Sequence, residues 1–169
     1  MEIRKQPKLM TKSAEVILEE FSDENIGYTF RFIQVDDYNK GYFGLLSQLT
    51  TAPECSYDDF RTRLELIEEY NNIMVIVVEK DEMIIGTISL VFEPKFIRKL
   101  GVVCHVEDVV VDENHRNLKL GSKMVNVAKK IAKARNCYKI ILDCNDNAKQ
   151  FYEKNNFEAK SSGMALYLD

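Results

Sequence analysis

The sequence predicts an α/β fold in which helices pack on both faces of a sheet. Segments rich in branched and aromatic residues alternate with segments of helical apolar spacing, in the order β, α, α, then three β, then α, β, α, β. Mixed orders of this kind place helices on both sides of a sheet. The 169 residues include only three prolines and seven glycines. We therefore expect one domain, residues 26–169, after an N-terminal appendage, residues 1–25, that holds one short helix beginning at Ser13.

The first half of the domain predicts a strand, two helices and a strand hairpin. Alternating apolar and polar side chains indicate the first strand. The second helix begins with Ser56 and Asp59, which resemble a capping pair. Two apolar runs separated by the Lys80-Asp81-Glu82 turn are typical of an antiparallel hairpin. The expected elements are a strand at 28–35, helices at 37–49 and 56–70, and strands at 73–79 and 84–93.

The second half predicts a valine-rich strand, a long helix and a shorter β, α, β series. Apolar residues of the long helix, from Leu120 to Ala132, fall at the i, i+4, i+7, i+8 spacing of one buried face. The expected elements are a strand at 103–111, a helix that ends near 136, a strand at 138–143, a helix at 146–155 and one or two final strands within 157–168.

Composition argues against several classes of function. The formal net charge of −4 disfavours general binding of nucleic acid. The longest uninterrupted apolar run, 73–78, is far shorter than the roughly 20 residues of a membrane-spanning helix, so no membrane association is expected. No apolar stretch follows the basic residues near the start, as it would in a secretory signal, so we expect a cytoplasmic protein. The four cysteines and two histidines lack the spacing of metal ligands or of a disulfide framework.

A stretch without acidic residues, 114–142, carries eight basic side chains and follows the strand at 103–111. A strand that leads through a tight loop into a helix presents free N–H groups and the positive end of the helix dipole, which together bind phosphate. The stretch therefore indicates a site for a phosphate-bearing ligand. An ordinary solvated basic helix face would give the same charge pattern.

Two motifs in this half resemble those of the GNAT superfamily of acetyltransferases. Arg116, followed by Gly121 and a helix, is similar to the loop that binds the pyrophosphate of acetyl-CoA, although Lys119 stands where the first glycine is usual. The second motif is residues 145–157, where Asn156 replaces a glycine and can also adopt a left-handed helix cap. The resemblance implies the GNAT fold, a mixed and mostly antiparallel twisted sheet with helices on both faces. It also implies acetyl-CoA as co-substrate and no metal.

Other segments are similar to glucosamine 6-phosphate N-acetyltransferases, and this resemblance covers about 28–164. These segments are Leu49-Thr50 and residues 95–98, 105–111 and 137–144. The implied reaction transfers the acetyl group of acetyl-CoA to the 2-amino group of D-glucosamine 6-phosphate, and gives N-acetylglucosamine 6-phosphate for UDP-N-acetylglucosamine biosynthesis. The alternatives are a GNAT enzyme for another small amine or a protein N-terminus, and a non-catalytic acetyl-CoA-binding module.

The resemblance also implies roles for single residues. Tyr152 is the donor to the departing CoA thiolate, and the backbone N–H of Val109 stabilises the oxyanion. Glu107, directly or through water, or the Asp143 region accepts the amine proton. The residues expected to bind acetyl-CoA are Val109, Val110, Val111, Arg116, Lys119, Leu120, Gly121, Ser122, Asn147, Phe151, Tyr152 and Lys154. The residues expected to bind the sugar phosphate are Thr50, Lys95, Phe96, Ile97, Arg98, Glu107, Asp108 and Asp143.

The resemblance further implies a homodimer in which the second subunit completes the sugar site. The sequence departs from this family near its end, where relatives carry an arginine for the sugar phosphate and this chain has Tyr167. No arginine occurs after Arg135, so we expect Lys95 and Arg98 to replace it.

Overall fold

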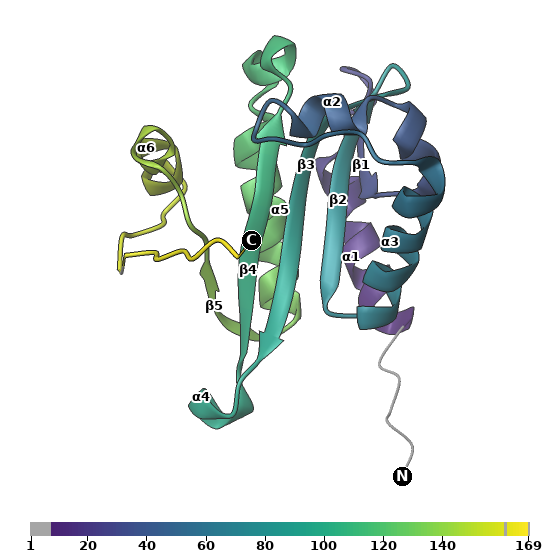
Figure 1. The fold of residues 1–169 in the computed structure, drawn as a ribbon. Coiled ribbons are helices and arrows are strands. Elements are labelled where there is room, and N and C mark those ends of the chain that lie inside the picture. The colour runs from purple at the N-terminus through teal and green to yellow at the C-terminus, as the bar shows by residue number, and fades with distance from the viewer. Residues whose placement is uncertain (1–7, 161, 169) are drawn as a thin grey trace.

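The structure, a computed structural model, describes residues 8–160 and 162–168 and contains one five-stranded sheet (Figure 1). The strands lie in the order β1 (Tyr28–Phe32), β2 (Ile73–Lys80), β3 (Met83–Pro94), β4 (Val102–Val111) and β5 (Cys137–Ile141). Neighbours among β1 to β4 are antiparallel, whereas β5 runs parallel to β4. The expected mixed, mostly antiparallel sheet is confirmed.

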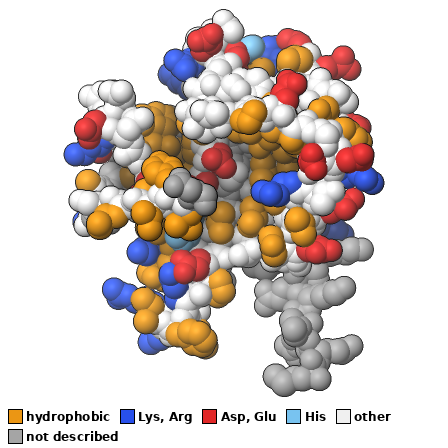
Figure 2. Space-filling view, in the orientation of Figure 1, with side chains coloured by type: hydrophobic (Ala, Val, Ile, Leu, Met, Phe, Trp, Pro, Cys, Tyr) orange, Lys and Arg blue, Asp and Glu red, His pale blue; other side chains and the backbone are white. Residues whose placement is uncertain are grey.

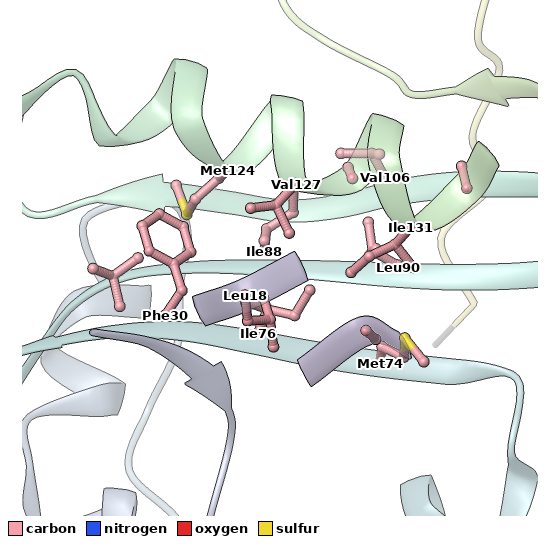
Figure 3. Packing of buried hydrophobic residues seen from close by; sticks show 14 of the residues in the cluster. Leu18, Phe30, Met74, Ile76, Ile88, Leu90, Val106, Met124, Val127 and Ile131 are labelled. Atoms are coloured by element: carbon pink, nitrogen blue, oxygen red, sulfur yellow. The ribbon is translucent and has the colours of Figure 1, made fainter. Parts of the chain in front are cut away.

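Helices cover both faces of this sheet (Figure 1). One face carries α1 (Lys8–Phe21) and α5 (Leu120–Ala134), and the other carries α2 (Tyr42–Leu46) and α3 (Tyr57–Tyr70). Figure 3 shows the first core, where side chains of α1 and α5 meet alternate residues of the central strands. Because both faces are covered, successive residues of β2 are buried, which explains its continuous apolar run.

Helix α1 begins at Lys8, five residues before the expected start at Ser13. Its inner face is part of the first core, and Leu18 is only 1% exposed there. The division into an appendage at 1–25 and a domain at 26–169 stays a prediction, and residues 1–7 lie outside the described part of the chain.

Two sequence expectations are wrong in the described residues. The helix expected at 37–49 is divided into a 3-10 helix, η1 (Val35–Asn39), and α2, because Gly41 has φ 77° between them. The final strands expected within 157–168 are absent from 157–160 and 162–168. A strand needs a neighbour with which to pair, and the apolar side chains of this segment stand exposed instead, Met164 at 99%.

The end of the sheet near β5 opens into a wedge. Strands β4 and β5 pair only from Val102 to His105 on β4, and beyond that point β5 turns away toward α6 (Asp146–Lys154) (Figure 1). On its other side, β4 contains a bulge opposite β3, where the register shifts between Thr87 and Ser89 and Asp108 has φ 50°. Bulges and parting strands are common beside functional sites.

Candidate active site

A cavity of about 610 Å³ occupies the wedge between β4 and α6. Four structural pieces contribute to it: the end of β4, the connection from η2 (Glu113–Leu118) into the start of α5, α6 with the residue before it, and the segment after α2. Its lining includes Val109, Val110, Val111, Arg116, Lys119, Gly121, Ser122, Asn147, Phe151 and Tyr152 from the residues expected to bind acetyl-CoA. Leu120 and Lys154 do not line it, and Leu120 is fully buried in the core at the start of α5.

The loop before α5 keeps its shape despite the missing glycine. Lys119 itself adopts the left-handed conformation, φ 56° and ψ 27°, which glycine adopts without strain. Its side chain is exposed, so the backbone can approach a ligand, and the residue lines the cavity. At Gly121, a glycine is favoured by side-chain packing rather than by backbone conformation. A Cβ there would lie 3.2 Å from the ring of Phe151, so glycine allows α6 to pack closely on α5.

A second cavity, of about 830 Å³, lies on the α2 and α3 face of the sheet. Its lining is mostly aromatic and aliphatic, and Glu107 and Asp108 from β4 stand at one side. Figure 2 looks onto this hollow, with orange apolar side chains at its floor. Since residues 107–108 line this cavity and residues 109–111 line the first, the two adjoin along β4 at the bulge. One ligand can therefore react with another across this strand.

Comparison with known proteins decides what this pair of cavities is. The Acetyltransferase (GNAT) family matches residues 35–157. The chain belongs to the GNAT family of acetyltransferases. It is 39% identical over 145 residues to glucosamine 6-phosphate N-acetyltransferase 1 of Dictyostelium discoideum, over 84% of this chain and 92% of the relative. The glucosamine 6-phosphate N-acetyltransferase of Arabidopsis thaliana is likewise 39% identical over 145 residues, with 84% and 97% covered.

A solved structure agrees with these relatives. The crystal structure of the Arabidopsis thaliana glucosamine-6-phosphate N-acetyltransferase matches with a TM-score of 0.81 at 37% identity, over 84% of this chain and 99% of that chain. The expected GNAT fold is thus confirmed, and the acetyl donor of this GNAT enzyme is acetyl-CoA.

The first cavity, between β4 and α6, is called the donor cavity below, and the second, beside α2 and α3, the acceptor cavity. Tyr152 on α6 lines the donor cavity. Its ring is held by Phe151 and Phe157, whose ring centroids lie 5.0 Å and 5.8 Å away. Burial, together with the nearby Cys144 and Glu107, raises the pKa of the Tyr152 hydroxyl above its ordinary value. The phenol therefore stays protonated at neutral pH. It makes no hydrogen bond to any other described residue, which leaves it available to a ligand.

Glu107 and Asp108 are the acidic residues of β4 that line the acceptor cavity. Partial burial and the neighbouring carboxylates of Asp108 and Asp143 raise the pKa of Glu107, while His105 lowers it. A carboxylate whose pKa is raised toward neutrality is a better base than an ordinary glutamate. Glu107 and Asp108 are thus brought to the acceptor cavity, with Asp143 close enough to Glu107 to influence its ionisation.

The other residues expected to bind the sugar phosphate lie away from both cavities. Thr50 is exposed in the segment after α2, whereas its neighbours Gln48 and Leu49 line the donor cavity. Lys95 is ion-paired with Glu93. Phe96, Ile97 and Arg98 lie at the exposed tip of the β3–β4 hairpin, in and beside α4 (Ile97–Leu100), and line neither cavity.

Sequence reasoning missed a contact between Gln48, after α2, and the segment Asp112–Glu113, which leads from β4 into η2. The Gln48 side chain donates to Asp112 Oδ2 at 2.8 Å and accepts from the backbone N–H of Glu113 at 3.0 Å. Asp112 also contacts His115 Nδ1 at 2.8 Å, and these bonds lower the pKa of the Asp112 carboxyl. Sequence patterns report contacts between residues a few positions apart. Gln48 and Asp112 are 64 positions apart, so no pattern in the sequence indicates their hydrogen bond.

Two classes of site are not found in the described residues. Across 8–160 and 162–168, no helix is both long and apolar enough to cross a bilayer. Over the same residues, no group of three or more His, Cys, Asp or Glu side chains is arranged to hold a metal ion.

Proposed function

We propose that this GNAT enzyme transfers the acetyl group of acetyl-CoA to the 2-amino group of D-glucosamine 6-phosphate, and so produces N-acetylglucosamine 6-phosphate and CoA. The names of its relatives suggest the acceptor. The observation that carries the proposal is that a donor cavity and an acidic acceptor cavity adjoin at the β4 bulge. Holding both reactants in this way supplies about 7–11 kcal/mol of the barrier reduction in well-oriented reactions.

On the donor side, the residues present fit acetyl-CoA. The part of β4 beyond His105 is not paired with β5, so its backbone can pair with the pantetheine arm as a neighbouring strand would. Arg116 and Lys119 form no ion pair with any described residue and line the cavity near the start of α5, so they are the residues proposed to bind the pyrophosphate. The N–H of Val109 is the donor proposed for the developing oxyanion.

On the acceptor side, the amine attacks the thioester carbonyl. A C–N bond forms, and the tetrahedral oxyanion collapses as the C–S bond breaks. The amine proton passes to Glu107, directly or through water, and Tyr152 gives a proton to the departing thiolate. The Asp143 region is the alternative acceptor of the amine proton. A module that only senses acetyl-CoA has no need of a leaving-group donor, so Tyr152 favours an enzyme.

We further propose a homodimer. Apolar side chains stand exposed on two segments, the hairpin tip and the C-terminal residues 162–168. They are Phe96, Ile97, Leu100, Met164, Leu166, Tyr167 and Leu168. A second copy would cover this surface, and would bring the hairpin residues 95–98 to the sugar site of its partner. Multi-angle light scattering should give twice the mass of the chain, and the double variant Leu166→Glu/Leu168→Glu should be monomeric; a monomeric wild type would contradict the dimer.

All four cysteines are free thiols, as is usual in a reducing compartment. This supports a cytoplasmic location as part of the proposal. Fractionation of cells that make the tagged protein tests it.

One assay separates the proposed function from its alternatives. The protein is mixed with acetyl-CoA and a panel of amines, namely glucosamine 6-phosphate, glucosamine, a polyamine and a peptide N-terminus, while free thiol is followed. We expect fastest thiol release with glucosamine 6-phosphate. A different preferred amine would leave only the GNAT assignment standing. Binding of acetyl-CoA without thiol release from any amine would instead indicate a non-catalytic module.

A further inference from the structure

The acceptor cavity has one basic side chain among the described residues that line it, Arg63 on α3. Phe60 and Leu64, which flank Arg63 on the helix, are buried against the sheet and hold this part of α3 in place. Arg63 is itself exposed and lines the cavity beside these apolar residues. Arg63 on α3 and the carboxylates of β4 thus line the same cavity.

The guanidinium of Arg63 is not occupied within the chain. It forms no ion pair or hydrogen bond with any residue that the structure describes. The acidic residue nearest to it in sequence among the cavity lining, Asp59, bonds to Ser56 Oγ at 2.6 Å in the helix cap. Arg61, two residues earlier, behaves differently, because it pairs with Asp58 at 3.1 Å on the exposed surface.

The charges of the cavity match an amino sugar phosphate. Glu107 and Asp108 suit the amino end, and a cation is required at the other end because the phosphate is dianionic. The chain offers few other candidates. Within one chain, Tyr167, at the place of the family arginine, is 91% exposed, Lys95 is paired with Glu93, and Arg98 lies at the hairpin tip outside the cavity. Lys95 and Arg98 would reach a sugar site only across the proposed dimer, whereas Arg63 lines the cavity of its own chain.

We propose that Arg63 binds the 6-phosphate of the acceptor and sets the preference for the phosphorylated sugar. This inference rests on the proposed function. The planar guanidinium can donate two parallel hydrogen bonds to a phosphate, so it recognises the phosphate by geometry as well as by charge. The inference differs from the expectation that Lys95 and Arg98 replace the family arginine at this contact.

The test compares kcat/KM for glucosamine 6-phosphate and for glucosamine in five proteins: wild type, Arg63→Ala, Arg63→Lys, Arg61→Ala and Arg98→Ala. Loss of one hydrogen-bonded charge contact corresponds to about a 10- to 150-fold change. We expect Arg63→Ala to lower kcat/KM for the phosphorylated sugar by this factor, with no change for glucosamine or in KM for acetyl-CoA. Arg63→Lys should recover part of the loss, and Arg61→Ala should match wild type.

The outcomes distinguish the two proposals. If wild type does not prefer the phosphorylated sugar, the proposed function fails. If wild type prefers it and Arg63→Ala keeps the preference, the function stands and the role of Arg63 is wrong. Loss of the preference in Arg98→Ala but not in Arg63→Ala would assign the phosphate to the hairpin. Equal losses with both sugars in Arg63→Ala would mean that Arg63 shapes the cavity only.

Discussion

Replacing Tyr152 by phenylalanine tests the proposed chemistry most directly. The ring packs between Phe151 and Phe157, so Tyr152→Phe keeps these contacts and removes only the hydroxyl. The hydroxyl has no hydrogen-bond partner among the described residues. Its removal therefore breaks no bond within that part of the fold, and any kinetic loss belongs to the reaction.

The expected magnitude follows from the charge that the hydroxyl meets. A hydrogen bond to a charged group contributes about 1.5–3 kcal/mol, so turnover should fall at least about tenfold. The binding constant for acetyl-CoA should stay the same, because the thioester carries no charge before the reaction. Stopped-flow detection of free thiol gives turnover, and calorimetric titration gives the affinity for acetyl-CoA.

Tyr138→Phe is the matched control, since this tyrosine lies on β5 outside the lining of the donor cavity. It should behave as wild type. Unchanged turnover in Tyr152→Phe would remove Tyr152 from the mechanism. A parallel loss of acetyl-CoA affinity would give the hydroxyl a role in binding instead.

Four further predictions follow from the structure. Arg116→Ala should weaken binding of acetyl-CoA about tenfold or more and binding of an analogue without the pyrophosphate much less; equal losses by calorimetry would make Arg116 structural. Because the Glu107 carboxylate accepts the proton and its pKa is raised above the ordinary 4.5, kcat/KM should rise with pH through a midpoint above 4.5, and Glu107→Gln should abolish this limb. Asp37 is fully buried and pairs with Arg31 at 2.6 Å, so Asp37→Asn should lower the free energy of unfolding in urea by about 3–5 kcal/mol; a change near zero would show that the pair is dispensable. Lys119→Gly should raise the free energy of unfolding by about 1 kcal/mol, because glycine adopts the left-handed backbone without strain, and should weaken acetyl-CoA binding. A fall in the free energy of unfolding would contradict the strain argument.

Local signals in the sequence were sufficient for most helices. Ser56 Oγ accepts from the backbone N–H of Asp59 at 3.1 Å and begins α3, as the capping pair predicted. The apolar spacing of the long helix identified its buried face, and Asn156 has the left-handed φ of 62° expected where relatives have glycine. These features depend on neighbours within a few residues, so a single sequence contains them.

Structural features that depend on contacts between residues far apart in the chain could not be predicted from these local sequence patterns. Asp37 leaves the expected helix pattern because it pairs with Arg31 on β1 and accepts from the N–H of Gln34, which fixes η1. Nothing in the sequence distinguishes Arg63 from the other charged residues of its helix. Its position over the acceptor cavity follows only from how α3 crosses the sheet.

The extra residue in β4 changes which face of the sheet each side chain meets. In an unbroken strand, residues separated by an even number share a face. Yet Val106 belongs to the core beneath α5, and Val110 belongs to the core beneath α2. The parity of the strand is therefore inverted at Asp108. Even-numbered residues face the α5 core before it and the α2 core after it, where Val109 and Val111 pack against the α5 core instead. Deleting a single residue here would restore the regular alternation and turn residues 109–111 over together, separating the donor side of the enzyme from its acceptor side.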